Sequence, residues 1–194
     1  MRRNRPLDDP SRCQRCRLPV GLCVCQALQA WPVQTRVLVL LHRVERYRTT
    51  NTGRIATLAL AGSELREWNL LDAVNDLQGL QGPGVFLLYP GEGAQVLAPE
   101  LEVRTLVVPD ATWRRTRRMV NRSGELARLP RVCLPAGAPS TFRLRTNRNP
   151  QSVCTLEALA RGLGLLEGPE VQAHLEQALD LFTERVLSTR PVNS

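Results

Sequence analysis

The sequence predicts an α/β fold with a largely parallel sheet. Short apolar runs alternate with helix-like segments between residue 34 and about residue 135, and the order strand, helix, strand favours parallel pairing. The runs are continuously apolar, as expected for strands that are covered on both faces. They span residues 35–41, 84–90, 104–110 and 131–135.

Helical patterns fill the intervals between these runs and the C-terminal part of the chain. Residues 54–68 and 112–129 have helical spacing of apolar side chains, and two further helices are expected over residues 152–166 and 169–187. Ser152 is the expected N-cap of the first of these, and Pro169 suits the first position of the second. The sequence shows no internal repeat.

The length of 194 residues suits one domain with a small appended module, and we place the boundary at residue 30. Residues 1–30 would form a cysteine-rich module and residues 31–194 the main domain. No segment approaches the roughly 20 apolar residues that a membrane-spanning helix needs. The basic N-terminus is not followed by the apolar stretch of a secretory signal. We therefore expect a cytoplasmic protein without a membrane partner.

The charge balance points to a polyanionic partner. The formal net charge is +8 and the sequence pI about 10.1, which favours nucleic acid through release of condensed counterions. All 26 basic residues are arginines. The coding bias of a GC-rich genome and the bidentate binding of phosphate by arginine both explain the exclusive use of arginine. The absence of lysine is therefore weak evidence about the partner.

Four cysteines near the N-terminus have metal-ligand spacing. Cys13, Cys16, Cys23 and Cys25 form a C-x2-C-x6-C-x-C array. In a reducing compartment such an array favours structural zinc over disulfides, a redox pair or unrelated thiols. The other two cysteines lie in apolar segments and are expected to be buried small side chains.

A candidate site follows from the sheet. Ligands of parallel sheets bind at the carboxyl ends of the strands, an edge where we expect Tyr89, Pro90, Asp110 and Pro135. The N-T-G-R turn of residues 51–54 opens a helix and offers backbone N–H groups to an anion, although an ordinary capped turn fits equally. His42, at a strand end, is a further possible member.

The segment after Asp110 is rich in arginine. Trp113, Thr116 and Val120 share one helical face, so Trp113 is expected to anchor the helix in the core. The arginines around them have no acids at i+4 spacing, which favours phosphate binding over a merely solvated face. A second basic loop precedes the helix expected at residues 152–166. The predicted RNA-binding residues are Arg114, Arg115, Arg118, Arg122, Arg143 and Arg145.

These segments together resemble the DTW-domain family, named for the D-x-T-W motif found here at Asp110, Thr112 and Trp113. The order of features agrees over nearly the whole chain, from the cysteine cluster through N-T-G-R, "LLYP", D-x-T-W and "CLP" to T-L-E-A at residues 155–158. Three positions depart from the family pattern: Arg43 follows His42, Thr116 replaces a small residue, and Phe142 replaces an aromatic hydroxyl.

The resemblance implies a SPOUT-like fold with a knot toward the C-terminal end, and the activity of a tRNA-uridine aminocarboxypropyltransferase. Such an enzyme transfers the 3-amino-3-carboxypropyl group of S-adenosylmethionine to N3 of a tRNA uridine and releases methylthioadenosine. Asp110 is then the residue that accepts or orients the N3 proton. The residues expected to contact S-adenosylmethionine are Asn51, Thr52, Gly53, Arg54, Tyr89, Pro90, Pro109, Thr112, Leu134, Pro135 and Thr155.

Two alternatives stay open at this point. A SPOUT-like methyltransferase would use the same cosubstrate on RNA, and a zinc-containing RNA-binding module would need no cosubstrate pocket. Binding of S-adenosylmethionine separates the module from both enzymes, and the by-product separates the two transfers. Nothing in the sequence indicates an obligate protein partner.

Overall fold

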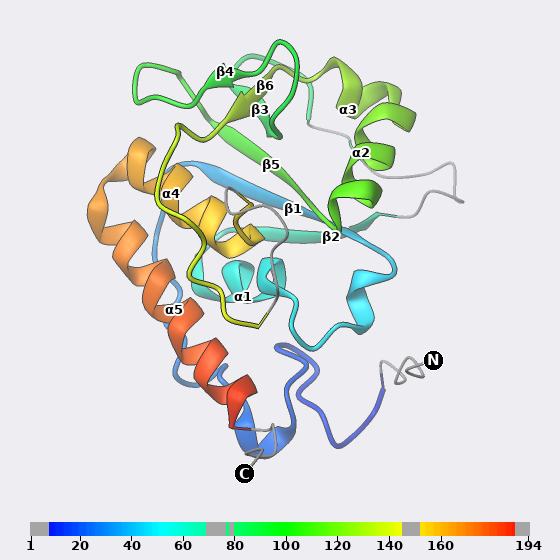
Figure 1. Cartoon of the computed structure of the whole chain (residues 1–194), viewed down its shortest axis with the longest axis vertical. Coiled ribbons are helices and arrows are strands. Elements are labelled where there is room, and N and C mark those ends of the chain that lie inside the picture. Colours follow the sequence, from blue (N-terminus) through cyan, green and yellow to red (C-terminus); the bar gives the residue numbers. More distant parts are fainter. Residues whose placement is uncertain (1–7, 69–76, 78–79, 145–151, 189–194) are drawn as a thin grey trace.

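The computed structural model describes residues 8–68, 77, 80–144 and 152–188. Figure 1 shows its helices arranged around one twisted sheet. The helices and strands are η1 (Val20–Leu22), β1 (Arg36–His42), η2 (Glu45–Tyr47), α1 (Thr52–Ala59), β2 (Glu64–Trp68), β3 (Val85–Leu88), β4 (Gln95–Val96), β5 (Thr105–Asp110), α2 (Trp113–Arg122), α3 (Gly124–Arg128), β6 (Arg131–Cys133), α4 (Thr155–Glu167) and α5 (Pro169–Leu187).

The sheet has six strands in the order β2-β1-β5-β3-β6-β4, and every pair is parallel. The four apolar runs predicted from the sequence form β1, β3, β5 and β6, so the predicted α/β class is confirmed. β5 is buried at every position because it lies in the middle of the sheet. Its carboxyl end, Asp110, lies beside Leu41 of β1.

Helices cover both faces of the sheet, which explains the continuous apolar runs. One core cluster joins the β1 side chains Val37 and Val39 to α1, α4 and α5. The other joins Leu38 and Leu40 of the same strand to α2 and α3. Alternate residues of β1 thus point into opposite cores, as the period of two in a strand requires.

Residues 54–68 are not one helix, and that prediction was wrong in its second half. α1 ends at Ala59, Gly62 adopts a left-handed conformation with φ of 71°, and the chain returns as β2. β2 is an edge strand whose Glu64 accepts hydrogen bonds from Arg36 of β1 and from Arg66. Strand pairing and these ion pairs override a local pattern that also fits a helix.

Two further helix details differ from the sequence prediction. The segment 112–129 divides at Ser123, whose hydroxyl accepts from the N–H of Leu126 and caps α3. The N-cap of α4 is Cys154 rather than Ser152, because Cys154 and Glu157 form a reciprocal capping box. α5 begins at Pro169 as predicted.

Trp113 does not anchor α2 in the core, so that prediction was also wrong. Its side chain is 53% exposed, whereas Met119 and Val120 are fully buried. Trp113 is the first residue of α2, close behind the carboxyl end of β5, and its ring lies beside Tyr89 rather than within the buried cluster.

The cysteine module lies against the main domain. Cys16, Leu18 and Val24 belong to the same buried cluster as β1, α1, α4 and α5. The division at residue 30 and the C-terminal knot both stay predictions. Among the residues that the structure describes, no helix is long and apolar enough to cross a membrane.

Candidate functional site at the carboxyl edge of the sheet

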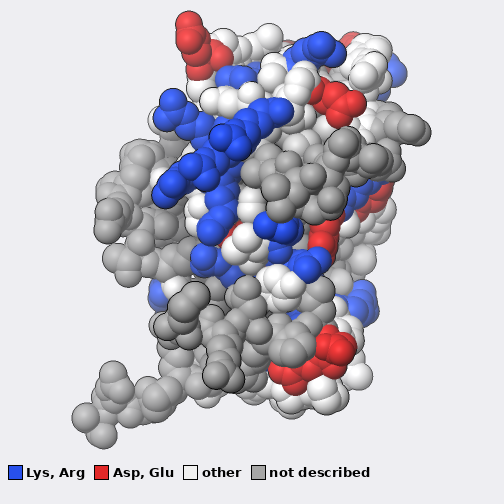
Figure 2. Space-filling view, turned by 90° about the vertical axis from the view of Figure 1, so that its right-hand side faces the viewer, with Lys and Arg blue, Asp and Glu red and all other residues white. Residues whose placement is uncertain are grey.

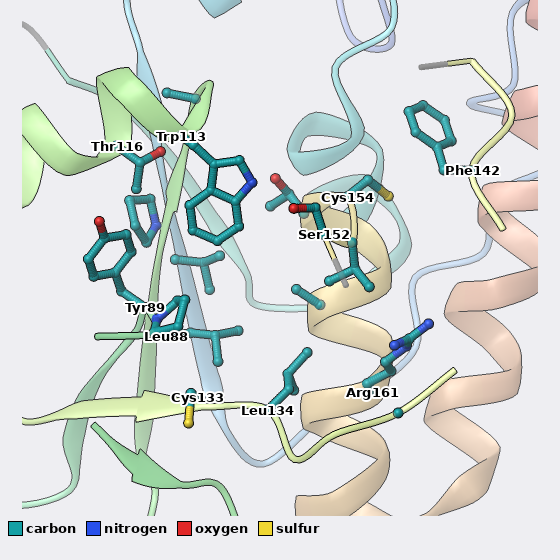
Figure 3. A pocket seen from close by; sticks show the side chains of 18 of the residues that line it. Leu88, Tyr89, Trp113, Thr116, Cys133, Leu134, Phe142, Ser152, Cys154 and Arg161 are labelled. Atoms are coloured by element: carbon teal, nitrogen blue, oxygen red, sulfur yellow. The ribbon is translucent and has the colours of Figure 1, made fainter. Parts of the chain in front are cut away.

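A cavity of about 420 Å³ opens at the carboxyl ends of β3, β5 and β6, against the start of α4. Figure 3 shows Tyr89 and Trp113 on one side and Ser152 and Cys154 on the other. The residues predicted from sequence that line it are Tyr89, Pro90, Pro109, Thr112, Leu134, Pro135 and Thr155. The ends of three strands therefore meet in one site, as their parallel arrangement predicts.

The lining is mostly apolar with a few polar groups. Leu88, Val108 and Leu134 contribute aliphatic surface, and Thr112, Thr116, Ser152 and Thr155 contribute hydroxyls. Among the described lining residues, Arg161 is the one charged side chain. Such a surface suits a ring system held by shape and a few hydrogen bonds.

Asp110 lies behind this cavity rather than in its lining. Its side chain is only 3% exposed, and both carboxylate oxygens accept hydrogen bonds. The Thr155 hydroxyl donates to Oδ1 at 2.7 Å and the Asn51 amide to Oδ2 at 2.5 Å. Asp110 thus joins β5 to the first residues of α1 and α4. It does not cap α2, whose N-cap is Thr112.

The turn of residues 51–54 supports Asp110. The Asn51 Oδ1 accepts from the N–H of Arg54 at 2.8 Å and so caps α1, while its amide faces Asp110. Gly53 approaches the Asp110 carboxylate so closely that a Cβ atom would collide with it, and the same atom would crowd Val39. Within the described part of the chain, the cavity lining includes none of Asn51, Thr52, Gly53 and Arg54. Their role as cosubstrate contacts stays a prediction.

Glu157 fixes the loop that closes one side of the cavity. It accepts from the Ser140 hydroxyl, the Thr141 N–H and the Cys154 N–H, each at 2.7 Å. Burial acts to raise the pKa of Glu157, but these hydrogen bonds outweigh it and lower the pKa below its usual range. Phe142, two residues after Ser140, lines the cavity.

An arginine groove adjoins the cavity. It has a volume of about 570 Å³ and is lined by Tyr89, Trp113, Arg114, Arg117, Arg118, Asn121 and Arg122. Figure 2 shows arginines gathered on the face that carries α2. Arg117 was missed by the sequence analysis. It lies four residues after Trp113, on a helical face that was assigned to the core.

Arg115 differs from its neighbours on α2. It is half-buried, its Nη1 lies 3.6 Å from Oε1 of Glu45, and it also reaches the Thr112 hydroxyl at 3.5 Å. Glu45 is paired on its other oxygen with Arg48 at 2.8 Å. Arg115 therefore holds α2 against η2, which makes it less available to RNA than Arg118. Of the second basic loop, Arg143 is exposed, and Arg145 lies outside the described residues.

His42, at the carboxyl end of β1, is also buried near this edge. Its Nδ1 accepts from the N–H of Val44 at 3.2 Å. Burial, together with the positive charges of Arg115 and Arg43, lowers the pKa of His42. The ring is therefore neutral at physiological pH and adds no positive charge to the site.

The four N-terminal cysteines converge on one point. All their sulfur atoms lie within 4.8 Å of one another. The Sγ atoms of Cys13 and Cys25 are 3.6 Å apart and those of Cys16 and Cys23 are 3.8 Å apart. A zinc ion with Zn–S bonds of about 2.3 Å needs tetrahedron edges of about 3.8 Å. The sulfur positions therefore fit a tetrahedral metal.

One thiol of this cluster is favoured as a thiolate. Burial acts to raise the pKa of Cys13, but hydrogen bonds from the backbone of Cys16 and Arg15 bring it down to about 6. Backbone N–H groups that face a sulfur in this way stabilise its negative charge.

The fold and the site define an α/β protein with a ligand cavity at the carboxyl edge of a parallel sheet, beside a basic groove. The chain belongs to the DTW domain family, which matches residues 10–187.

Individual relatives agree with this family. A tRNA-uridine aminocarboxypropyltransferase 2 from Drosophila melanogaster is 32% identical over 190 residues, covering 89% of this chain and 74% of that protein. The mouse protein of the same name is 26% identical over 174 residues, and the match covers 80% of this chain but only 56% of the mouse protein. The SAM-dependent rRNA:acp-transferase Tsr3 from Vulcanisaeta distributa has the same fold, with a TM-score of 0.57 at 17% identity over 81% of this chain and 79% of its own.

Proposed function

We propose that this protein transfers the 3-amino-3-carboxypropyl group of S-adenosylmethionine to N3 of a tRNA uridine. The observation that carries the proposal is that three features adjoin one another. An apolar cavity shares its edge with an arginine groove, and Thr155 of the cavity lining donates a hydrogen bond to the buried Asp110. The names of the relatives from Drosophila and mouse support the same activity.

The cavity suits the adenosine part of the cosubstrate. Backbone around Tyr89, Pro90, Leu134 and Pro135 would surround the adenine ring, with aliphatic side chains on its faces. The groove next to it suits RNA phosphates, because Arg114, Arg117, Arg118 and Arg122 are exposed along α2 and the helix contains no acidic residue. The two ligands then meet at the boundary between cavity and groove.

The reaction forms a bond between uridine N3 and the methylene carbon next to the sulfonium. The carbon–sulfur bond breaks with its electron pair going to sulfur, methylthioadenosine leaves, and the N3 proton must be taken up. We propose that the hydroxyl of Thr155, a residue that lines the cavity, accepts this proton while its own proton passes to Asp110. The sulfonium is a good leaving group, so correct placement of N3 accounts for much of the remaining rate.

The second part of this proposal is a structural zinc ion held by the four N-terminal cysteines, Cys13, Cys16, Cys23 and Cys25. The tetrahedral sulfur spacing supports it. The cluster packs on the same core as α1 and α4, so the metal would support the helix starts that hold Asp110.

The test is incubation of the purified protein with S-adenosylmethionine and tRNA, followed by mass spectrometry of the nucleosides and the by-product. Aminocarboxypropyluridine together with methylthioadenosine is the expected result. Methyluridine with adenosylhomocysteine would instead establish a methyltransferase. Failure to bind S-adenosylmethionine in calorimetry would leave an RNA-binding module.

A further inference from the structure

Tyr89 occupies the boundary between the two parts of the site. It follows β3 directly and lines both the cavity and the arginine groove. Its ring centroid lies 6.3 Å from that of Trp113, and the Arg131 guanidinium lies 5.9 Å from its centre. Figure 3 shows the Tyr89 and Trp113 side chains next to each other at this end of the cavity. Two neighbours therefore fix the orientation of a half-buried ring.

The proposed reaction restricts how a uridine can enter. N3 lies on the Watson–Crick edge, where a paired uridine uses it as the donor to its partner base, so the target base must be unpaired and turned out of its strand. A base turned out of a stack loses favourable contact with its neighbours. An aromatic side chain at the entrance offsets that loss, because every base offers a π-face.

We propose that Tyr89 is the stacking platform for the target uracil, with the strand on either side held by the arginine groove. The inference rests on the proposed function and adds the conformational class of the substrate, an unpaired and turned-out uridine. Tyr89 suits this role better than Trp113, because Arg131 and Trp113 already hold its ring and little side-chain freedom is lost on binding.

The test compares Tyr89→Leu with Tyr89→Phe. Stacking on an aromatic ring contributes about 1–3 kcal/mol per base, so Tyr89→Leu should weaken tRNA binding roughly 5- to 150-fold. Tyr89→Phe should bind within about threefold of the wild type, since it keeps the ring. The salt dependence of Kd should be unchanged in both, because no phosphate contact is lost. Trp31→Leu, at an exposed aromatic residue beside His174 of α5, is the matched control with unchanged binding.

Calorimetry with S-adenosylmethionine alone separates this role from a cosubstrate contact. The cosubstrate contact proposed for residue 89 is made by its backbone, which Tyr89→Leu keeps, so we expect S-adenosylmethionine affinity to fall several-fold less than tRNA affinity. A loss of cosubstrate affinity as large as the loss of tRNA affinity would assign Tyr89 to the cosubstrate and overturn the inference. Unchanged tRNA binding in Tyr89→Leu would overturn it as well.

A direct test uses a hairpin RNA with one 5-iodouridine in its loop and a second hairpin with the same nucleotide paired in its stem. Irradiation should crosslink the loop nucleotide, and peptide mapping should place the crosslink on Tyr89. Equal crosslinking of both hairpins, or a crosslink elsewhere, would refute the platform. Because these assays measure binding, they stay informative even if wild-type protein forms no aminocarboxypropyluridine, the outcome that contradicts the proposed function alone.

Discussion

Asp110→Asn separates a catalytic acid from a structural one. The carboxylate accepts from Thr155 and Asn51, and an asparagine of the same size can keep both contacts. Its carbonyl oxygen would accept from Asn51, and its amide would donate to the Thr155 hydroxyl, which can rotate to accept. The substitution therefore preserves the connection between β5, α1 and α4 but removes the group that takes up a proton.

The expected loss of stability follows from these two contacts. Hydrogen bonds to a charged group contribute about 1.5–3 kcal/mol and neutral ones about 0.5–1.5 kcal/mol, so two bonds lose about 2 kcal/mol together. In a protein of this size that lowers Tm by roughly 4–8 °C. Calorimetric melting checks this value and gives the temperature below which the assays use folded protein.

The expected loss of rate is much larger. General base catalysis contributes about two to four orders of magnitude, so Asp110→Asn should lower the single-turnover rate of transfer by that factor at saturating tRNA and S-adenosylmethionine. Binding of both should change little. Thr155→Ser, which keeps the hydroxyl, is expected to retain most of the rate, whereas Thr155→Val should resemble Asp110→Asn.

A near-normal rate for Asp110→Asn would refute this reasoning. Asp110 would then be a purely structural link between three elements, and the rate would be assigned to placement of N3 alone. If Thr155→Val were fast while Asp110→Asn were slow, the acid would act on N3 without the hydroxyl.

Three further predictions concern the groove, the metal and the loop. Arg118→Gln should weaken tRNA binding and lower the slope of log Kd against log salt by about one. Arg185→Gln, at an exposed arginine on α5, is the control and should change neither quantity. An unaltered slope for Arg118→Gln would assign that arginine to the solvated surface. Elemental analysis should find one zinc per chain. Cys16→Ser, at a residue only 1% exposed, should lose the metal and unfold at a lower urea concentration. Wild-type protein that is prepared without chelator and contains no zinc would contradict the site. Because folding lowers the pKa of Glu157, its stabilising contribution is complete above the unfolded value of about 4.3 and is lost as pH falls through the lower folded value. Urea midpoints should therefore fall more steeply between about pH 5 and pH 3 in the wild type than in Glu157→Gln, and parallel curves would show that Glu157 contributes nothing to the pH dependence.

The sequence by itself determined the features that depend on neighbouring residues. Continuous apolar runs require strands covered on both faces, and four of the six strands lie where those runs occur. The C-x2-C-x6-C-x-C spacing is the pattern of a metal site, which predicts that the four sulfurs come close together, as they do. Placing Asp110 at the carboxyl edge followed from its position at the end of an apolar run in a parallel sheet.

Tertiary structure decided the features that depend on distant residues. Asp110 is bonded to Asn51, 59 residues earlier, and to Thr155, 45 residues later, and no local pattern indicates that these three side chains meet. Periodicity places Trp113 and Val120 on one face of α2, but Trp113 is the first residue of that helix and lies beside Tyr89 outside the buried cluster. Trp113 is therefore exposed while Val120 is buried, because a helical face is apolar along its length only where another layer of the fold covers it.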